Sequence, residues 1–175
     1  MNIVHRLYKR SKQIFDNACI QTSDLPEELI KQIRNIQELI PMDILYDGED
    51  DIFVENGIQK QLHITILYGV DENLPIISNI VSKYSNVKIA ATSIDYFDSE
   101  DYTVAIIKHK SEKLTELHAD LKEVILNKDM YDTYTPHTTI AYLNKGERIV
   151  TDFKPVEWTI KEFEIVKIDG SIEEI

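Results

Sequence analysis

Two short segments of the chain share one pattern of chemically capable residues. In each, a histidine is followed after one residue by a threonine, and an isoleucine and a tyrosine occupy equivalent later places. The two copies are His63-Ile64-Thr65-Ile66-Leu67-Tyr68 and His137-Thr138-Thr139-Ile140-Ala141-Tyr142. Such an internal repeat indicates two related structural units within one chain.

The paired histidines and threonines are suited to phosphodiester chemistry. An imidazole titrates near neutral pH, so one histidine can accept a proton while the other donates one. A threonine hydroxyl can donate a hydrogen bond to a non-bridging phosphoryl oxygen. Each acid or base contribution is typically worth a factor of about 10² to 10⁴ in rate. We therefore expect His63, Thr65, His137 and Thr139 to be catalytic, with the assignment of acid and base left open.

Strand geometry predicts which side chains of each segment share a face. Side chains alternate along a strand, so His63 and Thr65 should point to one face, about 6.5–7 Å apart. The same alternation sends Tyr68 to the opposite face, and it sends Tyr142 away from His137. On this basis both tyrosines are expected to be structural residues of a packed face.

Two other interpretations of the histidines compete with catalysis. The first is that two buried strands each contain a hydrogen-bonded histidine and a threonine, since threonine favours strands. Repetition of the whole hexad argues against that coincidence. The second is a zinc site, which needs at least three protein ligands, and neither motif has a further suitably spaced ligand. We expect no metal and no other cofactor, and we expect His5, His109 and His118 to be solvated or packed.

Composition limits the partners of the protein. The 175 residues include 19 Lys and Arg against 31 Asp and Glu, a net charge of −12. This charge repels long phosphate backbones, so duplex DNA is not an expected partner, whereas a small anionic ligand held by local groups is allowed. The single cysteine, Cys19, excludes an internal disulfide. With no long apolar run and no signal-like start, we expect a cytoplasmic protein without membrane association.

Hydrophobic periodicity and turn residues predict an alternation of helices and strands without a linker. The residues from Asp24 to Glu27 resemble a capping box, and Ser111 is an expected N-cap. Expected helices cover 2–17, 24–40, 73–84 and 111–127. Expected strands cover 18–22, 61–68, 87–97, 102–108 and 136–143, with further strands between 158 and 168. We interpret 1–175 as one domain with two lobes, each carrying one His-x-Thr strand.

Several further residues are candidates for substrate binding. Gln61 shares the predicted face of His63, and Tyr134 lies just before the second motif. Trp158 could stack on a base, although a tryptophan in a strand is more often a core residue. Arg6 and Arg10 belong to a basic cluster on helix 2–17, whose simpler interpretation is a solvated helix face.

The two motifs, with Gly69 after the first and Pro136 before the second, resemble the paired His-x-Thr/Ser motifs of the 2H phosphoesterase superfamily. This superfamily includes 2′–5′ RNA ligase-like and cyclic phosphodiesterase-like proteins. The resemblance spans roughly residues 19–169. It implies an α+β, bilobal, pseudo-twofold LigT-like fold, in which two antiparallel sheets form a cleft with helices outside. It also implies metal-independent cleavage of phosphodiesters by His63, Thr65, His137 and Thr139.

Within the superfamily, the first motif and the compact acidic chain resemble phage-type members. These include nucleases that degrade cyclic oligonucleotide signals of the bacterial CBASS defence. The resemblance implies a viral hydrolase that works in the host cytoplasm on a small cyclic or oligonucleotide substrate. In that branch a ribose 2′-hydroxyl attacks phosphorus and leaves a 2′,3′-cyclic phosphate. Two alternatives remain: a protein that sequesters nucleotides without turnover, and an enzyme of RNA-end processing or 2′–5′ ligation.

Overall fold

The computed structural model describes residues 18–48, 53–71, 74–129 and 133–175, so the expected helix 2–17 lies outside the described residues. The helices are α2 (Glu27–Leu39), the short 3-10 helix η1 (Met42–Ile44), α3 (Leu74–Val81) and α4 (Glu112–Val124). The strands are β1 (Ala18–Thr22), β2 (Val54–Glu55), β3 (Ile58–Gln59), β4 (Ile64–Val70), β5 (Val87–Asp98), β6 (Tyr102–Lys110), β7 (His137–Asn144), β8 (Val156–Ile160), β9 (Glu164–Val166) and β10 (Ile172–Glu174).

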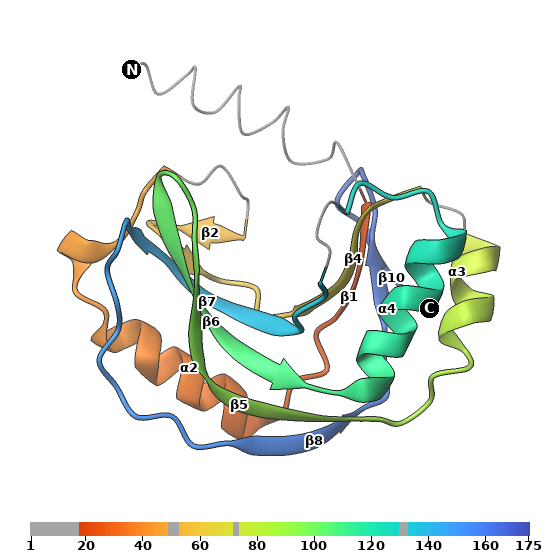
Figure 1. Ribbon diagram of the computed structural model, residues 1–175, viewed down its shortest axis with the longest axis horizontal. Helices are drawn as coiled ribbons and strands as arrows, with labels where there is room; N and C mark the ends of the chain where they lie inside the picture. Colours follow the sequence, from red (N-terminus) through yellow and green to blue (C-terminus); the bar gives the residue numbers. More distant parts are fainter. Residues whose placement is uncertain (1–17, 49–52, 72–73, 130–132) are drawn as a thin grey trace.

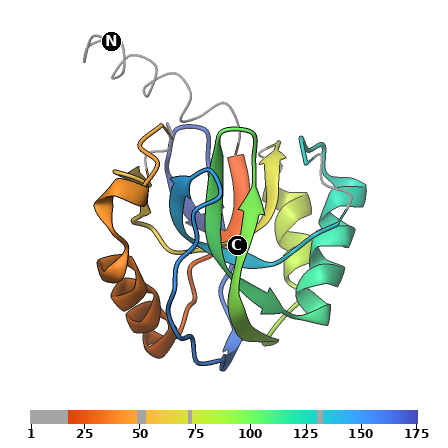
Figure 2. The same cartoon turned by 60° about the vertical axis from the view of Figure 1, so that its left-hand side comes forward.

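The strands form two antiparallel sheets, which confirms the expected α+β class. One sheet has the order β10-β9-β1-β4 and the other has the order β2-β3-β7-β6-β5-β8. Figure 1 shows β4 and β7 approaching each other at the centre, with α3 and α4 on the side of β4 and α2 on the side of β7. Figure 2 shows the same helices outside the strands. The motif strands of the two lobes therefore meet where the sheets come together.

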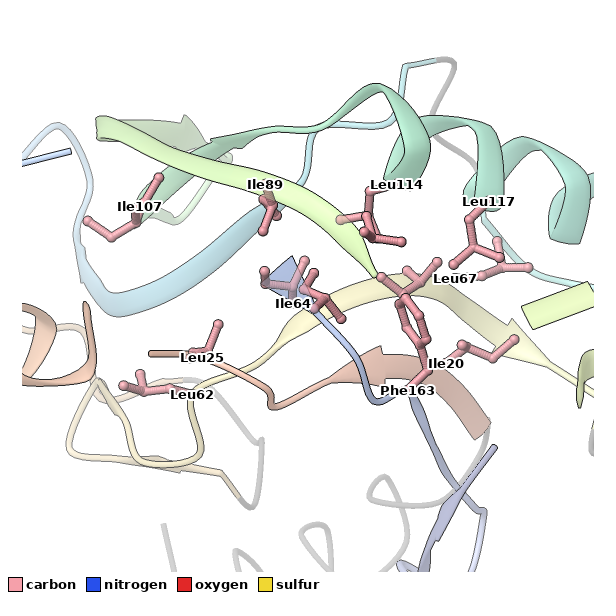
Figure 3. Close-up of a cluster of buried hydrophobic side chains, with 14 of the residues drawn as sticks. Ile20, Leu25, Leu62, Ile64, Leu67, Ile89, Ile107, Leu114, Leu117 and Phe163 are labelled. Atoms are coloured by element: carbon pink, nitrogen blue, oxygen red, sulfur yellow. The ribbon is translucent and has the colours of Figure 1, made fainter. Parts of the chain in front are cut away.

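A continuous apolar core fixes the outer face of both sheets. Ile64 and Leu67 of β4 are at most 1% exposed and lie with Leu114 and Leu117 of α4 (Figure 3). Burial of each such side chain is worth about 1.5–3 kcal/mol relative to exposure. In the second lobe, Gln37 of α2 donates through Nε2 to the carbonyl of Ile140 at 2.8 Å. The helices thus hold one face of each motif strand, and the motif threonines lie on the other face.

Most expected elements occur, with shifted ends. Ser111 is confirmed as the N-cap of α4, because its hydroxyl accepts a hydrogen bond from the amide of Leu114. The expected capping box at Asp24 is wrong: α2 begins at Glu27, and Asp24 Oδ2 instead accepts from the amide of Lys161 at 2.7 Å. Tertiary contact with the chain after β8 outweighs the local capping signal.

Membrane crossing by a helix finds no support in the structure. None of the helices among the described residues is long and apolar enough to span a bilayer.

His109 is a buried residue of the helical side of the larger sheet. It pairs with Ala91 across the sheet, its side chain is almost fully enclosed, and its Nε2 lies 2.9 Å from Thr138 Oγ1. Burial, followed by the charge of nearby His137, lowers the pKa of His109 to about 3. The native state therefore holds a neutral imidazole over most of the acidic range.

This burial predicts a specific loss of stability in acid. An unfolded histidine binds a proton near pH 6.5, whereas native His109 resists protonation down to about pH 3. The unfolded state binds more protons in that window, so stability falls as pH falls, by up to about 5 kcal/mol. In His109→Gln, the free energy of unfolding measured by urea titration should depend less on pH between about 3 and 6.5. Parallel pH curves for parent and variant would contradict this account.

Candidate active site

The two motif histidines are held in equivalent ways. His63 Nδ1 lies 3.0 Å from the carbonyl of Gln61, and His137 Nδ1 lies 2.7 Å from the carbonyl of Thr135. A carbonyl only accepts hydrogen bonds, so each Nδ1 carries the proton and the lone pair of a neutral ring is on Nε2. In both lobes the acceptor is the residue two places before the histidine. The repeat therefore presents the same ring nitrogen twice.

Gln61 supports the first histidine through its backbone. Its carbonyl accepts from His63 and from Gln59 Nε2, the latter at 3.0 Å. A carbonyl engaged by two side chains does not serve a strand ladder, which is consistent with β4 beginning at Ile64 and not at the expected Gln61. Direct binding of substrate by the Gln61 side chain stays a prediction.

Each imidazole also has a phenyl ring at its edge. Phe53 meets His63 with ring centroids 6.4 Å apart, and Phe97 meets His137 at 4.9 Å with planes 86° apart. Edge-to-face contacts of this kind restrict ring rotation. Neither phenylalanine was singled out from the sequence, because Phe53 follows an acidic loop and Phe97 ends a strand far from either motif.

The electrostatic setting of His137 favours its neutral form. Burial lowers the pKa of His137, the positive charge of His63 lowers it further, and the hydrogen bond to the Thr135 carbonyl opposes both effects. The two motif strands, β4 and β7, also contact each other directly. Figure 1 shows the same proximity in the backbone of β4 and β7.

Matching irregularities interrupt the two motif strands. In the pairing of β1 with β4, Gln21 is opposite Thr65 and Ile20 is opposite Leu67, so Ile66 is an additional residue. In the pairing of β6 with β7, Ile106 is opposite Thr139 and Ala105 is opposite Ala141, so Ile140 is additional. Each is a β-bulge, in which two residues of one strand oppose one of its partner.

The bulges overturn the expectation for the two tyrosines. A bulge shifts the alternation by one residue, so Tyr68 returns to the face of Thr65 and Tyr142 to the face of Thr139. Burial follows the same pattern, because the two residues between each threonine and tyrosine are buried. Tyr68 is 53% exposed and Tyr142 is half-buried. Both tyrosines therefore lie on the face that carries Thr65 and Thr139, which we call the reactive face. The prediction that they belong to the packed face is wrong.

A lysine and an aspartate accompany the second motif. Lys108 is directly opposite His137 in the ladder, and side chains of directly opposed residues share a face. Lys108 Nζ lies 3.1 Å from Asp95 Oδ2. The amide of Tyr96, and then Lys108, lower the pKa of the Asp95 carboxyl. Sequence reasoning missed this pair because a lysine near a strand end is common.

Tyr134 braces the two motif strands. Its hydroxyl donates to the carbonyl of Thr65 at 2.8 Å, and burial raises its pKa. Its ring stacks on His118 at 4.2 Å, with planes 4° apart. His118 Nδ1 lies 2.7 Å from the carbonyl of Ile66. Since Tyr134 precedes the second motif and binds the backbone of the first, it links them directly.

Among the described residues, Trp158 lies on the opposite face of the larger sheet from the motif histidine His137. Trp158 is opposite Ile89 on the helical face, donates through its indole N–H to the carbonyl of Asp24 at 2.9 Å, and contacts the ring of His109. Arg6 and Arg10 lie outside the described residues. In the described ranges, no group of three or more His, Cys, Asp or Glu side chains is arranged to hold a metal ion.

The coupling of the two rings gives a testable titration. Because the charge of His63 lowers the pKa of His137, replacing His63 with glutamine should raise the pKa of His137. NMR titration of the histidine ring protons measures this value. A pKa of His137 that is the same in parent and His63→Gln would contradict the electrostatic coupling of the two rings.

Comparison with known proteins places this geometry in a family. The family model described as the 2′-5′ RNA ligase superfamily matches residues 25–172. Curated protein sequences yield no significant match. Among solved structures, E. coli LigT complexed with phosphate is similar, with a TM-score of 0.52, 17% identity and coverage of 91% of this chain and 93% of that chain.

Two further E. coli LigT structures show the same likeness. The ATP complex has a TM-score of 0.50 at 16% identity, covering 91% of this chain and 92% of that one. The 3′-AMP complex has a TM-score of 0.50 at 17% identity, covering 90% and 92%. These values confirm the LigT-like fold of two antiparallel sheets. The chain belongs to the 2′-5′ RNA ligase superfamily and is thus a 2H phosphoesterase superfamily protein.

Proposed function

We propose that the protein is a phosphodiesterase that cleaves a small ribonucleotide by proton transfer between its two motif histidines. One observation carries this proposal: both rings are fixed through Nδ1 to the carbonyl two residues earlier, which leaves Nε2 of each ring for a substrate, on two strands that contact each other. General acid–base catalysis needs two such groups of opposite protonation state within reach of one substrate.

The proposed reaction uses His137 as base and His63 as acid, because burial favours neutral His137. His137 Nε2 accepts the proton of a ribose 2′-hydroxyl, whose oxygen forms a bond to phosphorus. The bond from phosphorus to the leaving oxygen breaks, and His63 Nε2 donates a proton to that oxygen. The products are a 2′,3′-cyclic phosphate and a free hydroxyl. Thr65 and Thr139 donate hydrogen bonds to the non-bridging oxygens as their charge grows.

The charge of the chain favours a small substrate. A net charge of −12 disfavours a long RNA, while Lys108 supplies a local cation beside His137. E. coli LigT, which has a similar fold, has been crystallised with ATP and with 3′-AMP. These complexes support a nucleotide as the ligand of the present protein. The finer part of the proposal is that a cyclic oligonucleotide immune signal of the CBASS type is the substrate.

Ligation is the second candidate, favoured by the name of the matching family. Joining a 2′,3′-cyclic phosphate to a hydroxyl is the reverse of the cleavage step. The same two histidines would act with their roles exchanged, because a catalyst accelerates both directions. Product masses from incubations with a cyclic phosphate and a free hydroxyl end separate ligation from cleavage.

Removing either motif imidazole should abolish turnover. His63→Ala and His137→Ala should each lower kcat by at least about 10²-fold on cyclic mono-, di- and trinucleotides, because each removes one proton-transfer group. Product formation is followed by chromatography with mass detection, without added metal. His109→Gln is the matched histidine control and should keep the parent rate at pH 7.

Several outcomes would refute or redirect this function. Equal rates for the alanine variants and the parent would remove the proposed catalytic roles. Intact ligand recovered after heat release from the parent would favour a sequestering protein. Loss of activity with a chelator and recovery with zinc would replace the proton-transfer scheme with a metal mechanism.

Lys108 is expected to assist binding of the anionic substrate. Lys108→Met should raise KM by roughly tenfold and change kcat less, because an exposed cation contributes mainly to attraction of the phosphate. Measurement of KM at low and high salt tests this, since the salt dependence should weaken in the variant. Lys167→Met is the control: Lys167 pairs with Glu173 at the far edge of the smaller sheet. Identical effects of the two substitutions would contradict a local role for Lys108.

A further inference from the structure

Tyr68 and Tyr142 occupy equivalent positions beyond the two phosphate-binding threonines. Each lies three residues after its threonine, and each reaches the reactive face only because of a β-bulge. We propose that Tyr68 and Tyr142 are two base platforms, one on each side of the scissile phosphate. The substrate class that follows is a dinucleotide unit with a nucleobase on both sides of the phosphodiester. This inference rests on the proposed function of the same site.

The surroundings of Tyr68 suit a stacking role. The side chain of Tyr68 is 53% exposed, whereas that of the preceding residue, Leu67, is buried in the core. The aromatic ring is therefore on the solvent side of β4. β4 is the edge strand of its sheet, so Tyr68 has a neighbouring strand of that sheet, β1, on one side only. An aromatic ring offers a nucleobase a flat partner at a cost of only two rotatable bonds.

Tyr142 is held in a fixed orientation by other tyrosines. The ring of Tyr102 meets it at 5.6 Å with planes 68° apart, and Tyr46 meets Tyr102 at 5.1 Å. The amide of Tyr46 also donates to the carbonyl of Tyr142 at 3.0 Å, which ties the η1 connection to β7. A ring that is already ordered loses little entropy when a base stacks on it.

Charge gives a reason for two platforms in place of many phosphate contacts. Nucleotide binding through cations releases counterions and needs several lysines or arginines, whereas this chain has a net charge of −12. Base–aromatic stacking is worth about 1–3 kcal/mol per base and tolerates all bases. Two equivalent rings flanking one phosphate therefore match a ligand with two bases. A single 2′,3′-cyclic nucleotide would use only one of them.

The test compares substrates that differ by one base. We would measure kcat/KM for the dinucleoside monophosphate ApA, in 2′–5′ and 3′–5′ linkages, and for ApA in which either adenosine is replaced by abasic ribose. Binding is measured separately with 3′–5′-linked ApA in which the 2′-hydroxyl beside the phosphodiester is absent (2′-deoxy ApA), because this analogue lacks the attacking hydroxyl. The proteins are the parent, Tyr68→Ala, Tyr142→Ala and Tyr84→Ala. Tyr84 is the matched control, because it hydrogen-bonds Asp120 of α4 on the outer side.

Each alanine variant at the platforms should lose about 5- to 150-fold in kcat/KM for ApA, as expected from the loss of one stacked base. With one base removed from the substrate, only one of the two variants should still lose activity. With the other base removed, the sensitivity should move to the other tyrosine. Tyr68→Phe and Tyr142→Phe keep the ring and should stay near the parent, as should Tyr84→Ala. Melting temperatures check folding, and Tyr142→Leu replaces Tyr142→Ala if the latter unfolds.

The outcomes distinguish this inference from the proposed function. Parent-like Kd and kcat/KM in both alanine variants would overturn the platforms while leaving the phosphodiesterase intact. Absence of 2′-deoxy ApA binding to the parent would also overturn them. Tyrosine-dependent binding of dinucleosides without any turnover would support the platforms and refute the phosphodiesterase.

Discussion

The active site depends on a hydrogen bond that occurs twice, from the Nδ1 atom of a histidine to the carbonyl two residues earlier. This bond selects the tautomer, leaves the lone pair of the neutral ring on Nε2 and opposes rotation of the ring. Its acceptors, Gln61 and Thr135, belong to the irregular segments that precede each motif strand. A regular strand would use such carbonyls in its ladder, so the strands must begin after them.

The core supplies the second requirement, a rigid support for these segments. Side chains of α4 pack on β4, and Gln37 of α2 binds the backbone of β7, so each motif strand has one face held by a helix. Tyr134 and His118 then bind the carbonyls of Thr65 and Ile66. Hydrogen bonds between elements far apart in the sequence thereby hold the first motif strand in place, and the bond from Tyr134 ties it to the segment just before the second. Precise spacing matters because misplacement by about 1 Å can cost a large factor in rate.

The pseudo-twofold arrangement has a consequence for recognition as well as for chemistry. Equivalent histidines, threonines and bulges occur in the two lobes, on strands that contact each other. The electrostatic surroundings of the two motifs nevertheless need not be equal, since the ion pair of Lys108 and Asp95 accompanies the second motif and burial lowers the pKa of His137. Similar geometry with different electrostatics allows one half to act as base and the other as acid.

The local sequence was sufficient for the repeat, most helices and strands, and the superfamily. These features follow from short-range periodicity and from motifs a few residues long. Tertiary structure decided the faces of Tyr68 and Tyr142, the start of α2, the roles of Tyr134 and Trp158, and the position of Lys108 beside His137. Each depends on cross-strand register or on a partner distant in the chain, and a single bulge reverses every face that strict alternation predicts.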